Sequence, residues 1–205
     1  KALIRSARLL AHIRRAAEFG IKKADAEFDF ADVMNRVQTI IKTVEPHDSV
    51  QRYSDLGVEV IEGEAKILSP WEVQVTTDGE TRTITTRYIV IAAGARPFVP
   101  PISGVEEVGY LTSDNIWALR ELPKRLIVLG GGPIGCELAQ SFARFGSQVT
   151  QVEMAPRLLI REDNDVSEIV MAKFRQEGIN VLVGHAAKKF IIEKGEKILI
   201  AEHQS

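Results

Sequence analysis

The sequence predicts an α/β fold whose second half is a doubly wound parallel sheet. Two observations indicate this class: short apolar runs alternate with amphipathic helical segments after residue 124, and a glycine-rich turn joins the first of these runs to a helix. A strand that is followed by a helix and then by another strand places the two strands parallel, because the helix carries the chain back across the sheet.

Composition excludes several classes of protein. The 205 residues suffice for one large domain or two small ones, and no apolar run is long enough to cross a membrane. The net charge of −2 gives no overall attraction to nucleic acid. The single cysteine, Cys136, excludes an internal disulfide and a cysteine-cluster zinc site, so we expect no metal site and a cytoplasmic location. Because the sequence opens with Lys1 rather than methionine, we expect a fragment of a longer protein.

Helical periodicity predicts two helices at the start of the chain. The first covers residues 1–19 and ends at Gly20, and the second follows a capping Asp29 and runs to Val44. The apolar stripe of the second helix is interpreted as core. The first helix is basic; we interpret this as a solvated face, with a surface near a phosphate-bearing cofactor or an acidic partner as the alternative.

The next part of the sequence predicts several strands and then a domain boundary. Alternation predicts strands at 57–61, 71–76 and 81–85, the last two joined by a tight turn at Asp78-Gly79. The apolar run 88–92 predicts a strand buried on both faces. A proline-rich stretch from Pro97 to Pro101 predicts a connector, so we expect domains at 1–103 and 104–205.

The second half is predicted as a helix opening at Ser113 or Asp114 and then an alternation of strands and helices. Strands are expected at 126–129, 148–152 and 179–183, helices at 133–145 and 163–177, and a closing hairpin at 189–193 and 197–201.

The glycine-rich turn carries the functional hypothesis. Its residues are Gly130, Gly131, Gly132, Pro133, Ile134 and Gly135, and the pattern is G-x-G-x-x-G. In this pattern the first glycine permits the turn, the second lets a pyrophosphate approach the backbone, and the third lets the helix pack closely on the strand. Amides at the helix start and the helix dipole would hold the phosphates. The sequence therefore predicts a Rossmann-like NAD(P)-binding unit; the alternative is a glycine-rich turn that binds nothing.

Glu153 predicts the choice of cofactor. It ends the next predicted strand, 23 residues after Gly130, where a carboxylate can accept hydrogen bonds from the adenosine ribose of NAD. A 2′-phosphate at about 4 Å would meet like charge, at a cost of roughly 4 kcal/mol. NAD is therefore favoured over NADP, although Arg157 lies close enough in sequence to offset part of the repulsion.

With these features the chain resembles the FAD-dependent pyridine nucleotide–disulfide oxidoreductases, which include dihydrolipoamide dehydrogenase, glutathione reductase and mercuric reductase. The resemblance rests on the order of features: a Gly63-Glu-Ala65 turn before a hairpin, the run from Ile89 to Gly94, a proline linker, and then the glycine motif. The opening Lys1–Arg5 is most similar to mercuric reductases, and dihydrolipoamide dehydrogenases share part of it.

The resemblance implies a partial FAD-binding domain of similar architecture in residues 1–103, with its own dinucleotide motif and redox disulfide outside this sequence. It implies that Lys1 and Glu137 pair beside the flavin as catalytic residues. It also implies that Ala65, Ala93, Gly94 and Ala95 lie against FAD and that Ala187 lies near the adenine of the nicotinamide nucleotide. Ala93 replaces a usual threonine, which removes a hydroxyl. Cys136 has no redox role.

The implied activity belongs to the parent protein. Hydride would pass from NAD(P)H to FAD and on to a redox-active disulfide or similar acceptor, while the fragment alone is expected to be inactive. The family further implies a homodimer formed through a carboxy-terminal domain, and no nucleic-acid or membrane partner is expected. Two alternatives stay open: a non-catalytic NAD-binding or sensing module, and an NADH oxidase-type flavoenzyme without the disulfide step.

Overall fold

The computed structural model describes residues 1–204, and the chain forms two compact units. Unit 1 comprises residues 1–40 together with the chain from residue 97 onward, and unit 2 comprises residues 41–96. Within the described residues, no helix has both the length and the apolar character that crossing a membrane requires.

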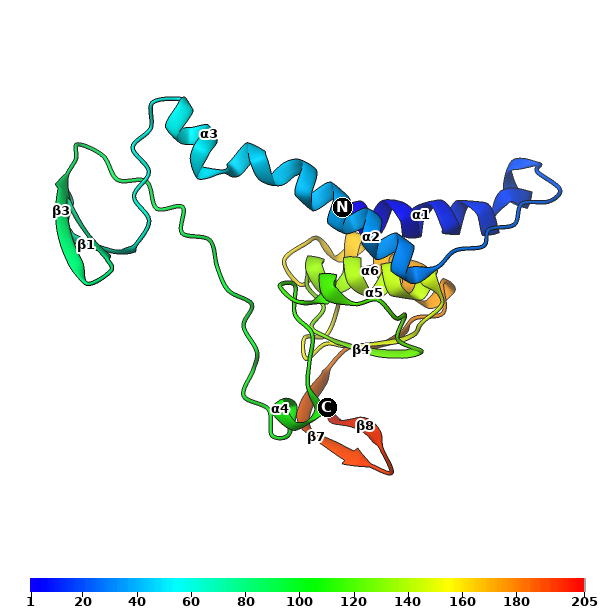
Figure 1. Ribbon diagram of the computed structural model, residues 1–205. Coiled ribbons are helices and arrows are strands. Elements are labelled where there is room, and N and C mark those ends of the chain that lie inside the picture. The colour runs from blue at the N-terminus through cyan, green and yellow to red at the C-terminus, as the bar shows by residue number, and fades with distance from the viewer. Residues whose placement is uncertain (205) are drawn as a thin grey trace. The chain divides into compact units, whose positions relative to one another are not determined.

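Unit 1 is built on a parallel sheet. Its strands β4 (Arg125–Leu129), β5 (Gln148–Val152) and β6 (Asn180–Leu182) lie in that order, joined by helices α5 (Pro133–Phe145) and α6 (Asn164–Gln176) (Figure 1). Leu126 pairs with Val149, and Val152 pairs with Leu182. The predicted alternation of strands and helices is confirmed, and with it the Rossmann-like parallel arrangement.

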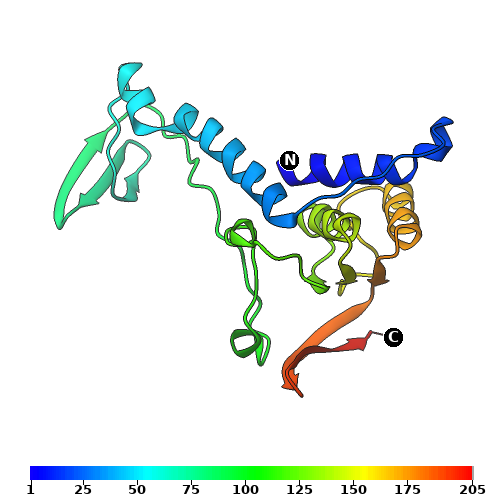
Figure 2. The same ribbon diagram turned by 45° about the vertical axis from the view of Figure 1, so that its right-hand side comes forward.

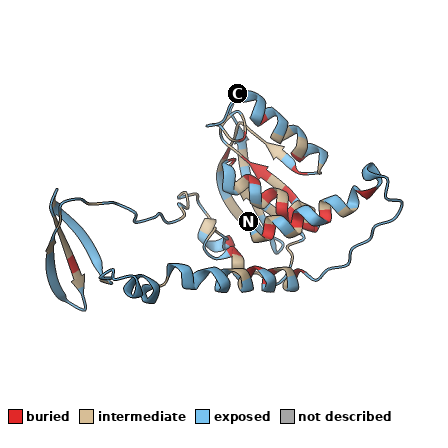
Figure 3. Ribbon diagram, turned by 90° about the horizontal axis from the view of Figure 1, so that it is seen from above, coloured by how far each residue is buried: buried red, intermediate tan, exposed pale blue. Residues whose placement is uncertain are grey.

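The core of unit 1 lies where α5 meets the first helices. Figures 1 and 2 both place α5 between the strands and helix α1 (Ala2–Arg14). Helix α2 (Phe30–Val44) begins where the Asp29 carboxylate accepts a hydrogen bond from the Ala31 amide. Buried residues gather on these helices and on the sheet (Figure 3), among them Leu3, Ala7, Leu10, Phe30, Met34, Val37, Ala139, Phe142 and Phe145. The predicted core stripe of α2 is therefore confirmed as far as Val37.

Short elements complete unit 1. A 3₁₀ turn η1 (Ala16–Phe19) ends the first helical segment at Gly20, whose φ of 76° is the left-handed conformation expected of a helix stop. Helix α4 (Val105–Val108) and the 3₁₀ turn η3 (Ile116–Ala118) precede the sheet. Strands β7 (His185–Glu193) and β8 (Glu196–His203) form the predicted closing hairpin.

Unit 2 contains the end of α2, the turn η2 (Glu45–Asp48), helix α3 (Val50–Asp55) and an antiparallel sheet. The strands of this sheet are β1 (Glu64–Ser69), β2 (Glu72–Thr77) and β3 (Glu80–Thr85), in sequence order. Asp78 and Gly79 both have positive φ, at 50° and 85°, so the predicted tight hairpin turn is confirmed.

Two predicted strands are wrong. Residues 57–61 are a turn followed by irregular chain, and residues 88–92 are irregular, with Tyr88 and Val90 80% and 87% exposed. The physical reason is pairing: the sheet of unit 2 consists of β1, β2 and β3, and none of these strands pairs with either segment. The contact between β3 and residues 57–61 is a side-chain ion pair, in which Arg82 donates to Glu59 at 2.8 Å. A run with strand propensity stays irregular when no ladder partner lies beside it.

The domain boundaries at 1–103 and 104–205 stay a prediction. The compact units divide the chain elsewhere, because α1 packs on α5 and so joins the amino-terminal residues to the parallel sheet.

Candidate dinucleotide site

The glycine turn connects the end of β4 to the start of α5. Gly130 has a φ of 108°, which only glycine adopts readily, and its amide donates to the Val152 carbonyl oxygen at 2.8 Å. Gly132 is the N-cap of α5 and Pro133 is the first helical residue. The amides of the first turn of α5 therefore emerge at the carboxyl edge of the sheet, which is the position that suits an anion.

The three other glycines have different surroundings. A Cβ on Gly135 would lie 2.5 Å from the Gly130 carbonyl oxygen, so the helix approaches the turn too closely for any side chain. A Cβ on Gly131 would lie 2.7 Å from Leu158 Cδ2 and 2.9 Å from Glu153 Oε2. At Gly132, by contrast, nothing lies within 4 Å, so the open space of the turn lies at the middle glycine of the motif.

The Glu153 carboxylate lies against the glycine turn. Its Oε2 accepts a hydrogen bond from the Gly131 amide, and its Oε1 accepts one from the Ala155 amide at 2.6 Å. These two bonds fix the side chain, which is half-buried. A carboxylate offers about four acceptor positions, so capacity for two further donors remains.

The Arg157 side chain is hydrogen-bonded to backbone oxygens of the loop after β5. Its guanidinium donates to the carbonyl oxygens of Leu159, Ile160 and Glu162 at 2.8 to 3.3 Å, which holds the loop after β5. The cation that could have offset the charge of Glu153 toward a phosphate is thus engaged by backbone oxygens.

Sequence reasoning missed two residues that support the turn. Gln151 is fully buried on β5, and its Nε2 donates to the Gly130 carbonyl oxygen at 3.0 Å. Leu158 is also fully buried and contacts Gly131. Neither residue has a distinctive sequence signal, because Gln151 lies on a strand that also contains Gln148 and Thr150, and Leu158 looks like any other loop leucine.

Cys136 is buried in the first turns of α5. Its thiol lies 3.5 Å from the Gly131 carbonyl oxygen, and Gln151 Nε2 lies 3.5 Å from its sulfur. Burial raises the pKa of this thiol above its ordinary value. A protonated, enclosed sulfur is a packing group, not a nucleophile.

The remaining predicted residues are not gathered at this turn. Lys1, the residue before α1, and Glu137, on α5, are both exposed, and no ion pair joins them within residues 1–204. Ala65 lies exposed on β1 of unit 2, and the segment Ala93, Gly94 and Ala95 is exposed irregular chain of the same unit. Ala187 lies on β7 opposite Ala201.

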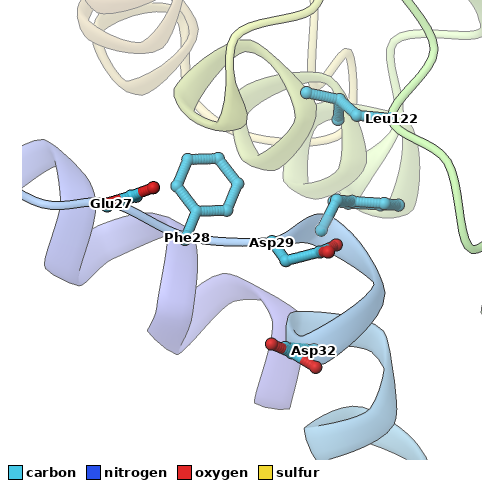
Figure 4. A pocket seen from close by; sticks show the side chains of 6 residues that line it. Glu27, Phe28, Asp29, Asp32 and Leu122 are labelled. Atoms are coloured by element: carbon cyan, nitrogen blue, oxygen red, sulfur yellow. The ribbon is translucent and has the colours of Figure 1, made fainter.

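A hollow of about 710 Å³ lies elsewhere in unit 1 (Figure 4). Phe28, Phe30 and Leu122 contribute apolar surface, and Glu27, Asp29 and Asp32 contribute carboxylates. None of the predicted site residues lines it, and Asp29 is already bonded to the Ala31 amide as a helix cap. Residues 1–204 contain no cluster of three or more His, Cys, Asp or Glu side chains placed to hold a metal ion.

Comparison with known proteins points to one family. Residues 11–204 match the family model described as pyridine nucleotide-disulphide oxidoreductase. The chain is 31% identical over 185 residues to a mercuric reductase of Lysinibacillus sphaericus, covering 90% of this chain and 33% of that protein. It is 36% identical over 188 residues to a dihydrolipoyl dehydrogenase of Chlorobaculum tepidum, covering 90% of this chain and 39% of that protein.

A solved structure of a flavoprotein disulfide reductase is similar to this chain. A Cu(II) complex of a mutant of the HOCl-induced flavoprotein disulfide reductase RclA from Escherichia coli matches with a TM-score of 0.78 and 27% identity. The match covers 100% of this chain and 43% of that one. The chain thus spans between a third and two fifths of the two curated relatives.

Proposed function

Because this chain belongs to the pyridine nucleotide-disulphide oxidoreductase family, we propose that its glycine turn and Glu153 bind the nicotinamide dinucleotide of a flavin-dependent oxidoreductase. The observation that carries the proposal is the arrangement at the end of β4 and β5. There the open middle glycine, the start of α5 and a fixed carboxylate lie together.

The turn fits a diphosphate. Gly132 leaves open the space that a Cβ would fill, and Pro133 at the first helical position withholds no amide that the helix itself needs. The amides at the start of α5 and the helix dipole would bind the two phosphates. A nicotinamide dinucleotide supplies hydride when bound; the contribution of this chain is to orient it.

Glu153 supports NAD over NADP. Its two backbone hydrogen bonds hold the carboxylate beside the turn, where its remaining acceptor positions suit two ribose hydroxyls. A 2′-phosphate placed there would face that charge at a cost of roughly 4 kcal/mol. Arg157, bonded to three carbonyl oxygens, is poorly placed to relieve it.

The flavin positions of this chain do not form a cradle. Ala65 is exposed on its strand, and Gly94 has nothing within 4 Å of a Cβ. Transfer of electrons to FAD and onward to a disulfide or similar acceptor, by a homodimeric cytoplasmic parent, is proposed from family membership, with Lys1 and Glu137 beside the flavin.

Calorimetric titration with NADH and NADPH tests the proposal. We expect NADH to bind at least tenfold more tightly than NADPH, since even a third of the electrostatic cost corresponds to about tenfold in affinity. The Glu153→Ala variant should bind NADH more weakly, and its affinities for NADH and NADPH should differ less than those of the unmodified chain. The control variant Glu168→Ala, which removes an exposed carboxylate on α6, should change neither the affinity for NADH nor the ratio of the two affinities. Equal affinities for the two cofactors in the unmodified chain would contradict the assignment of Glu153.

A further inference from the structure

One peptide group in the glycine turn is held at both ends by side chains at and just after the end of β5. The group that links Gly130 to Gly131 presents its carbonyl oxygen to Gln151 Nε2, at 3.0 Å, and its N–H to Glu153 Oε2. Gln151 lies on β5 and Glu153 directly follows the strand, and residues two apart along a strand direction project to the same side, so both side chains reach this peptide group. Between them, the Val152 carbonyl oxygen accepts the Gly130 amide.

Gln151 is an unusual residue to find at this place. It is completely buried, and its Oε1 has no hydrogen-bond partner within residues 1–204. A buried acceptor without a partner destabilises a fold, so the glutamine needs a reason that packing does not supply. The side-chain NH₂ group supplies such a reason, because its Nε2 lies within hydrogen-bonding distance of both the Gly130 carbonyl oxygen and the Cys136 sulfur.

The carbonyl oxygen of the next peptide group, that of Gly131, is also held by hydrogen bonds. The Gly131 carbonyl oxygen accepts from the Leu159 amide at 2.7 Å and lies 3.5 Å from the Cys136 thiol, to which Gln151 also donates. Gln151 Nε2 also lies 3.4 Å from the position that a Cβ on Gly135 would occupy, so the glutamine side chain packs between the glycine turn and α5. Glycine alone would let these two peptide groups rotate.

We propose that Gln151 is a positioning residue that, with Glu153, clamps the Gly130–Gly131 peptide group and so holds the turn in the conformation that binds the dinucleotide diphosphate. The inference rests on the proposed function, since the diphosphate is the ligand that the turn would hold. It assigns Gln151 no contact with the cofactor. The Gly131 N–H is taken up by Glu153, so the amides left for phosphate are those from Gly132 onward.

Gln151→Met tests this inference, because methionine keeps the length and loses the donor. Gln148→Met on the same strand, at an exposed position, is the matched control. We expect Gln151→Met to raise the Kd for NADH about tenfold, or about 1.4 kcal/mol, because the glycine turn is then no longer held in the conformation that binds the diphosphate. Its melting temperature should change little, because the variant removes one unpartnered acceptor, Gln151 Oε1, but deprives another, the Gly130 carbonyl oxygen, of its donor. The control should change neither quantity.

Two results would overturn the inference. One is an unchanged Kd in Gln151→Met; the other is a Kd that worsens only in step with a fall in melting temperature, which would mark an ordinary packing residue. If Gln151→Met does not fold, Gln151→Leu provides the same comparison with a shorter apolar side chain.

Hydrogen exchange separates this inference from the proposed function, because it needs no cofactor. In the unmodified chain the Gly131 amide should exchange slowly, and it should exchange faster in the Gln151 variants than in Gln148→Met. Rapid exchange at Gly131 in the unmodified chain would overturn the clamp. Slow exchange at Gly131 together with no binding of NADH would uphold the clamp and overturn the proposed function.

Discussion

Gly132 and Gly135 are the same residue type, yet the space available for a side chain differs at the two positions. A Cβ at Gly135 would meet the Gly130 carbonyl oxygen at 2.5 Å, while a Cβ at Gly132 would meet nothing. Gly135→Ala should therefore lower the free energy of unfolding by about 2 kcal/mol through overpacking. Gly132→Ala should lower it by far less but should weaken NADH binding. Thermal unfolding and calorimetry on both variants check this, and a reversed pattern would contradict the assigned roles.

The Cys136 thiol leads to a prediction about reactivity. Burial raises its pKa, and its sulfur is enclosed by Gly131 and Gln151. Iodoacetamide should therefore leave the folded chain unmodified at neutral pH and should label it once denaturant unfolds it. Mass spectrometry reads the label directly; rapid labelling of the folded chain would show that the thiol is accessible and reactive.

Among contacts between elements, the pair Arg144–Glu177 ties the end of α5 to the residue that caps α6. The pair is bidentate, at 2.8 and 2.9 Å, and both side chains are 16% exposed. Burial alone would raise the pKa of the Glu177 carboxyl, but the hydrogen bonds and charge of Arg144 outweigh it and lower that pKa. The stabilisation is therefore complete above pH 4.5, the ordinary carboxyl value, and is lost as the pH falls through the lowered pKa.

Glu177→Gln should cost about 2 kcal/mol at neutral pH, because it weakens charge-assisted hydrogen bonds. The variant should also lose less stability than the unmodified chain on acidification. Glu18→Gln is a suitable control, since it removes a similar pair with Arg15 that is exposed and contributes little. Chemical denaturation between pH 3 and pH 7 measures both effects; equal losses for the two variants would contradict the role of burial.

Elements with local signals were predictable, and elements that depend on a partner were not. The bounds of α5 and β5 agree with prediction, since Pro133 opens the helix and Gly146 closes it in the left-handed conformation. Helix α3 carried a missed local signal, because the Ser49 hydroxyl accepts from the Arg52 amide as a cap. The run 88–92 has strand composition, but whether it pairs is decided by the rest of the fold.

The same distinction applies to the candidate site. The glycines and Glu153 follow from spacing along the chain, because a turn and the strand after it are fixed by local geometry. The hydrogen bonds of Gln151 depend on the register of β5 beside β4, which pairs Leu129 with Val152. No pattern in the sequence specifies that register to one residue, so this support became visible only in the fold.

The segment from the hairpin of unit 2 into the proline stretch leads to a prediction for the whole chain. Tyr88 and Phe98 are 80% and 84% exposed in irregular chain. Chymotrypsin should therefore cleave there first and separate unit 2 from the carboxy-terminal part, which contains the buried Phe142 and Phe174. Fragment masses at early times check this; first cleavage within α5 or α6 would contradict the assignment of the two units.

A crystal structure of the chain grown with excess NAD tests the central claim most directly. The diphosphate should lie at the start of α5 beside Gly132, with the adenosine ribose hydroxyls within hydrogen-bonding distance of the Glu153 carboxylate. A dinucleotide bound elsewhere, or an empty turn under conditions where calorimetry shows saturation, would contradict the account.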